Sequence, residues 1–184
     1  MLKILIVEDE PLLAQTLQHL VELDPTRRVT AIVDDLQSAL AAVERETPDL
    51  ALVDLQLANG TSGFSVAAKF HEMNVLCLFT TGKAPSFPVP DLAIGCLSKP
   101  FQEADLARAL REAEDILRGR ERLVRLRRLP EQLEIYAVPG ETERAADEPF
   151  LQPARPRSLL QRLRRLLRPP SRYRSGVPVP TDAR

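Results

Sequence analysis

The sequence predicts an α/β protein with a doubly wound parallel sheet, followed by a basic C-terminal tail. Three observations lead to this prediction. Five short apolar runs have the character of buried strands, stretches with helical spacing alternate with them, and the net charge changes sign along the 184 residues. Strands that alternate with helices form a parallel sheet covered by helices on both faces.

The predicted strands are rich in Ile, Val and Leu, as strands buried on both faces of a sheet usually are. They comprise residues 2–7, 29–33, 50–55, 75–80 and 93–97. Polar residues stand where these runs end. Three acidic residues follow the first run directly, and the third run contains Asp54 near its end.

Four helices are predicted from apolar residues at helical spacing. Those positions are 13, 17, 20 and 21, then 36, 40 and 43, then 64, 67 and 70, and finally 106, 110, 113 and 117. Pro11 suits the first turn of a helix, and Asp34 or Asp35 can cap the second one. Residues 81–92, between the last two strands, contain three prolines, so we expect a proline-braced loop there instead of a helix.

Polar side chains gather at the carboxyl ends of the predicted strands, which is where α/β sheets of this kind bind ligands. The residues placed there are Glu8, Asp9, Asp54, Thr80, Thr81, Ser98 and Lys99. Carboxylates so close together repel one another unless a cation joins them, and Mg²⁺ prefers oxygen ligands. An Asp beside Mg²⁺, a Lys and a hydroxyl can act as a nucleophile on phosphorus.

Four separated sequence marks, in this order, make the chain resemble the receiver domain of bacterial two-component response regulators. They are Val-Glu-Asp-Glu at residues 7–10, Leu-Val-Asp-Leu around Asp54, Phe-Thr-Thr-Gly at 79–82 and Lys-Pro-Phe from Lys99. The resemblance covers residues 1–118. It implies a flavodoxin-like fold with a sheet of five parallel strands. The fourth helix of the family is expected to be missing here.

The resemblance implies a role for each polar residue. Asp54 would accept a phosphoryl group. Mg²⁺ would be held by Asp9, assisted by Glu8, together with Asp54 and the backbone carbonyl of Gln56. The expected cofactor is therefore Mg²⁺.

The phosphoryl oxygens would be contacted by two further residues. Lys99 would pair with them, and the bond from Lys99 to the following proline is expected to be cis. Thr81, followed by a small glycine, would be the switch hydroxyl, with Thr80 as the alternative.

Several positions depart from the usual receiver pattern. Cys96 stands where the family often carries a Tyr or Phe that reports phosphorylation, and the loop after Asp54 lacks the usual proline. The Phe-x-Thr-Gly stretch is similar to that of FAT GUY receivers, which are tied to bacterial general stress responses. Lys83 and Ala84 do not complete that pattern.

The implied function is that of a cytoplasmic response regulator, phosphorylated by a histidine kinase or a histidine phosphotransfer protein. We expect no enzyme beyond the receiver's own phosphoryl transfer and hydrolysis. The opening residues are too few and too acidic for a signal peptide, and no apolar run approaches the roughly 18 residues of a membrane span. Two alternatives stay open. One is a degenerate receiver that binds proteins without phosphorylation, and the other is a haloacid-dehalogenase-type phosphatase, although Gln56 stands where that family needs a second Asp.

The remainder of the chain differs in charge from the predicted receiver. Residues 1–117 carry a net charge of −9 and residues 118–184 carry +8. We divide the chain into a receiver at 1–118, a helix extension and linker at 119–156, and a basic amphipathic helix with a disordered tail at 157–184. The last receiver helix is expected to run on to about Arg128. This extension is either a solvated basic segment or a surface that pairs two copies of the chain. Residues 133–138 alternate in character and suggest a lone strand.

Five leucines on one face and several arginines around them predict the basic amphipathic helix. It would dock on an acidic partner or on the chain's own receiver, lie on an anionic membrane, or touch nucleic acid. No helix-turn-helix pair precedes it, so sequence-specific DNA binding is not expected. A downstream protein partner would bind through this tail or through the proline-rich loop.

Overall fold

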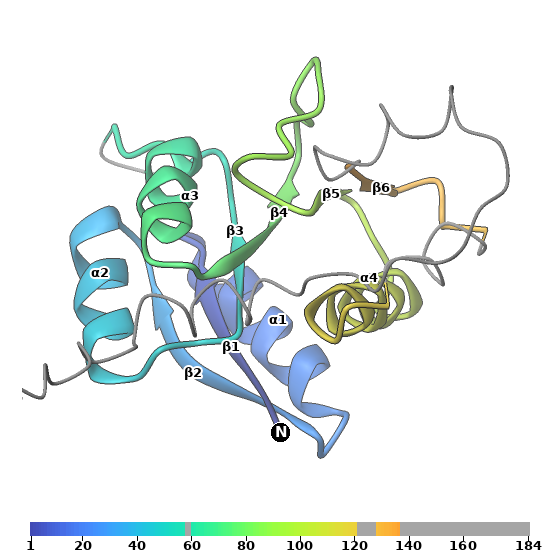
Figure 1. Cartoon of the computed structure of the whole chain (residues 1–184), viewed down its shortest axis with the longest axis horizontal. Helices are drawn as coiled ribbons and strands as arrows, with labels where there is room; N and C mark the ends of the chain where they lie inside the picture. The colour runs from blue at the N-terminus through green and yellow to red at the C-terminus, as the bar shows by residue number, and fades with distance from the viewer. Residues whose placement is uncertain (58–59, 121–127, 137–184) are drawn as a thin grey trace, which may run out of the picture. The chain divides into compact units, whose positions relative to one another are not determined.

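A computed structural model describes residues 1–57, 60–120 and 128–136, which form one sheet with helices on both faces (Figure 1). The strands are β1 (Leu2–Val7), β2 (Arg27–Val33), β3 (Leu50–Val53), β4 (Leu76–Thr81), β5 (Gly95–Ser98) and β6 (Leu133–Ile135). The helices are α1 (Pro11–Glu22), α2 (Leu36–Arg45), α3 (Gly63–Glu72) and α4 (Glu103–Leu117).

The strand order is β2-β1-β3-β4-β5-β6, and β1 to β5 are all parallel. This confirms the predicted doubly wound parallel sheet of five strands, with strand ends displaced by a few residues. The strand order reverses between β1 and β3, and folds of this kind bind ligands in the crevice beyond the carboxyl ends of the strands at that point.

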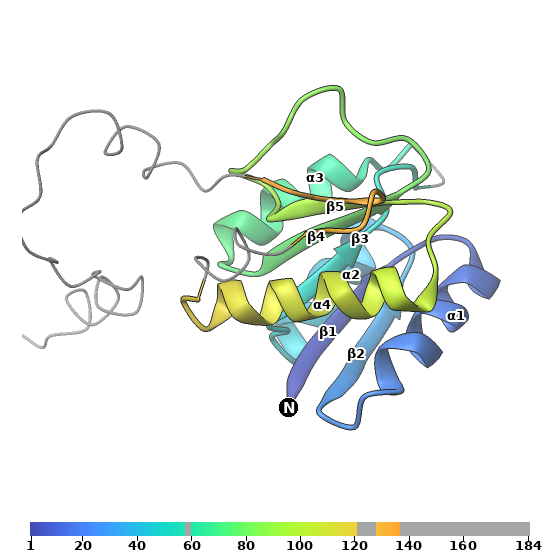
Figure 2. The ribbon, with the colours of Figure 1, turned by 90° about the vertical axis from the view of Figure 1, so that its right-hand side faces the viewer.

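Two layers of helices cover the sheet. Helices α1 and α4 lie over one face, and α2 and α3 lie over the other (Figures 1 and 2). Alternate residues of each strand point to opposite faces, so β1 contributes Ile4 and Ile6 to one core and Leu5 and Val7 to the other. The described core is mainly aliphatic, with Phe70, Phe79 and Tyr136 as its buried aromatic residues, as the scarcity of aromatic residues predicts.

Local signals in the sequence account for the helix starts. Pro11 occupies the first position of α1. Asp35 caps α2, since its carboxylate accepts a hydrogen bond of 2.7 Å from the amide of Ser38. Both starts agree with the predicted positions.

The segment between β4 and β5 is a loop, as predicted. Residues 82–94 are all described and contain no helix. Val89 and Leu92 anchor the loop against the core, while the Phe87 side chain is 69% exposed. Prolines before and after Phe87 restrict the backbone, because each proline fixes one dihedral angle and lacks an amide donor.

The predicted continuation of the last helix toward Arg128 is wrong. Helix α4 ends at Leu117, and Gly119 adopts a left-handed φ of 69°. The Gly119 amide donates to the Ile116 carbonyl and the Arg120 amide donates to the Asp115 carbonyl, at 2.9 and 2.7 Å. This pair of hydrogen bonds is a Schellman motif, which terminates a helix at a glycine.

The strand predicted to stand alone at residues 133–138 in fact joins the sheet. Residues Leu133–Ile135 form β6, which pairs antiparallel with β5. Residues 121–127 and 137–156 of the predicted linker lie outside the described residues. The predicted basic helix and tail at 157–184 also lie outside them. Among the helices that are described, none has the length and hydropathy needed to cross a membrane.

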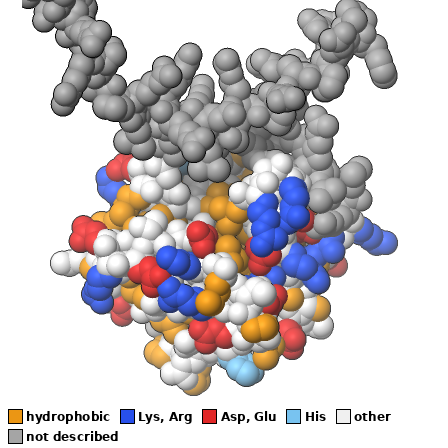
Figure 3. All heavy atoms as spheres, turned by 60° about the horizontal axis from the view of Figure 1, so that its bottom comes forward, with side chains coloured by type: hydrophobic (Ala, Val, Ile, Leu, Met, Phe, Trp, Pro, Cys, Tyr) orange, Lys and Arg blue, Asp and Glu red, His pale blue; other side chains and the backbone are white. Residues whose placement is uncertain are grey.

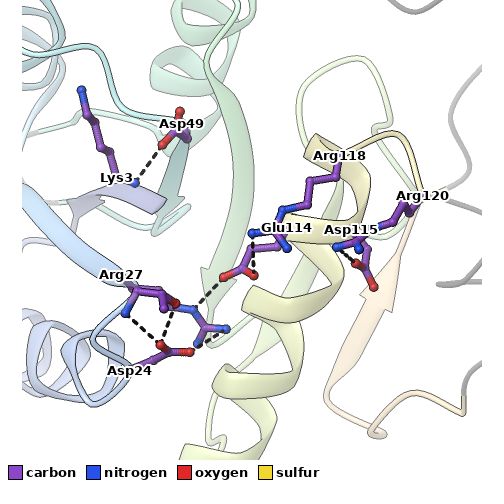
Figure 4. A network of polar contacts seen from close by, with 9 residues as sticks. Lys3, Asp24, Arg27, Asp49, Glu114, Asp115, Arg118 and Arg120 are labelled. Carbon is purple, nitrogen blue, oxygen red and sulfur yellow. Dashed lines mark hydrogen bonds and ion pairs between the residues drawn. The ribbon is translucent and has the colours of Figure 1, made fainter. Parts of the chain in front are cut away.

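A polar network ties α4 to the start of β2 (Figure 4). Arg27 is buried, and its guanidinium binds Glu114 of α4 at 2.9 Å and Asp24 at 3.6 Å. Acidic, basic and hydrophobic side chains are interspersed over the described part of the face in Figure 3. Exposed ion pairs are worth little, whereas a buried guanidinium that loses its partners is costly.

We therefore predict that Arg27→Ala lowers the free energy of unfolding by about 2 kcal/mol, between the values typical of exposed and buried pairs. Lys69→Ala is the matched control, because Lys69 forms an exposed pair with Glu72 in α3. This control should cost no more than about 0.5 kcal/mol. Urea unfolding of the full chain measures both, and equal losses would contradict the role assigned to Arg27.

Candidate functional site

The candidate site lies where the strand order reverses, between the carboxyl ends of β1 and β3. Glu8 and Asp9 follow β1, and Asp54 follows β3. Backbone hydrogen bonds hold both turns, because the Asp54 amide donates to the Val7 carbonyl and the Glu8 amide donates to the Val33 carbonyl, each at 2.9 Å. The parallel register of the two strands thus brings these carboxyl groups together.

The three carboxyl groups form one compact cluster. Carboxylate oxygens of Glu8, Asp9 and Asp54 all lie within 4.8 Å of one another. Glu8 and Asp54 are only 3% and 6% exposed, and Asp9 is half-buried. Three oxygen donors of this charge and spacing fit a hard divalent cation such as Mg²⁺.

Lys99 supplies the positive charge of the cluster. Its Nζ atom binds Glu8 Oε2 at 2.8 Å and Asp54 Oδ2 at 2.5 Å. The peptide bond from Lys99 to Pro100 is cis, as expected. The side chain reaches the site from β5, across β4, so residues 91 and 45 positions apart in the chain meet here.

Burial and pairing compete in the protonation of these groups. Burial raises the pKa of Glu8, and the hydrogen bond from Lys99 opposes this rise. Burial lowers the pKa of Lys99, but hydrogen bonds to Asp54 and Glu8 outweigh it, so the pKa lies above its usual value. The Lys99 ammonium is therefore charged at neutral pH and offsets part of the carboxylate repulsion.

The loop after β3 holds the Asp54 carboxylate from its other side. The Gln56 amide donates to Asp54 Oδ1 at 2.9 Å, and the Gly63 amide donates to the Leu55 carbonyl at 3.2 Å. Gly63, the first residue of α3, packs tightly here, because a Cβ atom on it would lie 2.0 Å from the Asp54 carbonyl oxygen. Sequence reasoning did not single out Gly63, although a glycine at the start of a predicted helix beside a candidate site is a usable signal.

Both threonines at the end of β4 are buried, in different surroundings. The Thr81 carbonyl accepts a hydrogen bond of 2.8 Å from the Lys99 amide, and its hydroxyl contacts the backbone of Lys83. The Thr80 hydroxyl has no hydrogen-bond partner among the described residues. Thr81 is the residue whose carbonyl is bonded to the Lys99 backbone, and its choice as the switch hydroxyl over Thr80 stays a prediction.

Cys96, at the position where an aromatic residue was noted as missing, lies beside an aromatic ring from elsewhere in the chain. The Cys96 thiol and the side chain of Tyr136, which follows β6, are both buried in the same hydrophobic core. Sequence reasoning missed this contact. The alternation in residues 133–138 predicted a strand but not its partner.

A family model described as "Response regulator receiver domain" matches residues 4–111, more than half of the chain. The chain belongs to the response regulator receiver family. Its sheet order, the acidic cluster and the cis peptide after Lys99 agree with the fold that the sequence resemblance implied.

Three curated relatives are similar to this chain. The positive alginate biosynthesis regulatory protein of Pseudomonas aeruginosa is 34% identical over 61% of this chain and 47% of its own length. The protein-glutamate methylesterase/protein-glutamine glutaminase 1 of Cereibacter sphaeroides is 32% identical over 84% of this chain and 42% of its own. The phyllosphere-induced regulator PhyR of Methylorubrum extorquens is 33% identical over 60% and 43%. The chain spans less than half the length of each.

Solved receiver structures have the same fold. A CheY-like receiver domain protein from Methanospirillum hungatei superimposes with a TM-score of 0.59 and 25% identity. The match covers 65% of this chain and 98% of that one. The matched part of this chain therefore corresponds to nearly all of that receiver domain protein.

The packing of Gly63 against Asp54 gives a testable prediction. Gly63→Ala should lower the free energy of unfolding by about 1–3 kcal/mol, because the new methyl group must displace the backbone of the Asp54 loop. Gly82→Ala is the control, since a Cβ atom there meets no atom within 4 Å. Urea unfolding measures both variants. A tolerated Gly63→Ala would show that the loop after β3 moves freely.

Proposed function

We propose that this chain is a phosphorylation-dependent response regulator of a two-component or phosphorelay system, with Asp54 as the phosphoacceptor. The observation that carries the proposal is the contact of the Lys99 ammonium with Asp54 inside a cluster of three carboxylates. A paired nucleophile, a cation and further acids are the groups that phosphoryl transfer to a carboxylate requires.

The chain's residues divide the chemistry as follows. A carboxylate oxygen of Asp54 attacks phosphorus, the bond from phosphorus to the donor's imidazole nitrogen breaks, and the electron pair leaves with the imidazole. Lys99, already 2.5 Å from Asp54, moves onto the transferred phosphoryl oxygens, and Thr81 contacts them with its hydroxyl. Glu8, Asp9, Asp54 and the Gln56 carbonyl would hold Mg²⁺, which offsets the negative charge that accumulates on the phosphoryl group.

The alternatives receive less support. A degenerate receiver that only binds proteins would not need to keep the acidic cluster and Lys99 in contact, and this chain keeps them. A haloacid-dehalogenase-type phosphatase needs a second acid two residues after its nucleophile, whereas this chain has the exposed amide Gln56. Membership of the receiver family points the same way.

The proposed partners and organisation extend beyond the described residues. A histidine kinase or histidine phosphotransfer protein in the cytoplasm would donate the phosphoryl group. Residues 1–118 would act as the receiver, 119–156 as a connecting segment and 157–184 as a basic segment. The output would be a protein contact through this basic segment or the proline-rich loop, with pairing of two copies as an alternative. The likeness to PhyR agrees with the FAT GUY-like sequence at residues 79–82.

The proposal predicts that acetyl phosphate with Mg²⁺ adds one phosphoryl group to the full chain. Asp54→Asn should abolish this addition, because an amide oxygen is not an anionic nucleophile. Asp49→Asn is the control, since Asp49 precedes β3, at the opposite end of that strand. Intact-mass measurement decides the matter. An equal mass gain in Asp54→Asn would remove Asp54 as the acceptor.

The metal assignment gives a separate prediction. Asp9→Asn should weaken Mg²⁺ binding by about tenfold or more, because it removes one of three anionic ligands. Glu10→Gln is the matched control, since Glu10 is exposed and is not part of the carboxylate cluster. Titration calorimetry with Mg²⁺ measures both affinities. Equal weakening in the two variants would indicate a general charge effect instead of a ligand role for Asp9.

A further inference from the structure

Strand β6 adds an antiparallel edge to the parallel receiver sheet (Figure 2). Its register sets Cys96 opposite Glu134, with Gly95 and Leu97 opposite Ile135 and Leu133. Backbone hydrogen bonds of 2.8 Å hold both ends of the pairing, from the Ser98 amide to the Gln132 carbonyl and from the Tyr136 amide to the Ile94 carbonyl. The strand is also the last described element before residues 137–184.

Strand β6 is packed into the protein and does not lie loosely on it. Leu133 and Tyr136 are each 4% exposed, and they enter the hydrophobic cores on opposite faces of the sheet. Gly95 allows the close approach, because a Cβ atom there would lie 2.2 Å from the Glu134 carbonyl oxygen. Only a glycine on β5 permits this pairing.

The buried Cys96 thiol connects Tyr136 with the acidic site. Cys96 and Tyr136 belong to the same hydrophobic core, and Cys96 stands three residues before Lys99. The same core contains Val53, the residue before Asp54. Burial raises the pKa of Cys96 to about 11, so at neutral pH this link is an uncharged thiol.

The backbone provides a second and more direct connection. Two successive amides of β5 donate in opposite directions, Ser98 to the Gln132 carbonyl beside β6 and Lys99 to the Thr81 carbonyl of β4. The side chain of the same Lys99 binds Asp54. A displacement of Lys99 therefore acts on both neighbouring strands.

We propose that β6 is a phosphorylation-sensitive strand, held on β5 by Tyr136 and Cys96 and loosened when Lys99 leaves Asp54 for a phosphoryl group. This inference rests on the proposed function. It assigns to Tyr136 a positioning role, through Cys96, in transmitting the state of Asp54 to the chain that follows β6.

Phosphorylation is expected to affect β6 and not β4, because the two strands beside β5 are held by different numbers of neighbouring strands. A phosphoryl group on Asp54 must separate the carboxylate from the Lys99 ammonium, which moves the end of β5. Strand β4 is paired on both of its edges, whereas β6 has three residues and, among the described strands, pairs only with β5. The pairing of β5 with β6 is therefore the one that weakens when Asp54 is phosphorylated.

The coupling must also operate in reverse, because linkage between two sites is reciprocal. Loosening β6 by mutation should favour the phosphorylated form of Asp54. Gly95→Ala loosens it by steric conflict with Glu134, and Tyr136→Leu does so by removing part of a side chain that is buried in the core. Lys69→Ala, which breaks an exposed ion pair in α3, is the control.

Hydrogen exchange of the full chain, with and without acetyl phosphate and Mg²⁺, tests the inference. We expect faster exchange in peptides covering residues 128–136 after phosphorylation, and no change in peptides from β1 and β3. Tyr173→Phe leaves Tyr136 as the sole tyrosine in a chain without tryptophan, so its fluorescence should change in parallel. Gly95→Ala should bind the phosphoryl mimic beryllium trifluoride at least about fivefold more tightly than Lys69→Ala does.

The outcomes separate this inference from the proposed function. A phosphoryl mass gain with unchanged or slower exchange at residues 128–136 overturns the role of β6 and leaves the proposed function intact. Faster exchange throughout the sheet shows general destabilisation and also overturns it. Without any mass gain the proposed function fails, and Lys99→Met then decides the coupling. That variant must speed exchange at residues 128–136, and exchange equal to the unmodified chain overturns the inference.

Discussion

The repulsion among the buried carboxylates at the reversal of strand order constrains the rest of the receiver. Glu8 and Asp54 are almost completely buried beside Asp9, so their charges are only weakly screened by solvent. The Lys99 ammonium relieves part of this repulsion, and to do so it must reach from β5 across β4. One cation therefore links the residues that follow β1, β3 and β5 at this end of the sheet.

Close backbone approach then positions the groups around that cation. The Asp54 loop is clamped between its Gln56 amide and Gly63, and β5 is clamped between β4 and β6 by successive amides. Both clamps use a glycine where a side chain would collide with a carbonyl oxygen. Strain introduced at the site has few ways to relax, since protein interiors are densely packed.

Much of this could be predicted from the sequence, and the failures have physical reasons. Apolar runs and the residues that follow them predicted the five parallel strands and the cluster of Glu8, Asp9, Asp54 and Lys99, because register alone brings strand ends together. The end of α4 was missed because the expected continuation ran through Gly119, whereas a left-handed glycine is favourable at a helix end. The partner of β6 was not predictable from its own alternation, since pairing depends on a distant glycine in β5.

The edge strand also explains how a receiver without a helix between β4 and β5 keeps its sheet covered. A parallel edge strand exposes unpaired backbone groups, which invite pairing with other chains. Here β6 occupies the edge of β5, Tyr136 fills the core beside Cys96, and Val89 and Leu92 of the proline-rich loop pack against the same core. The loop and β6 thus together cover the sheet in place of the missing helix. Because β6 leads directly into the segment after residue 136, the element that completes the fold is also the one best placed to connect the site with the rest of the chain.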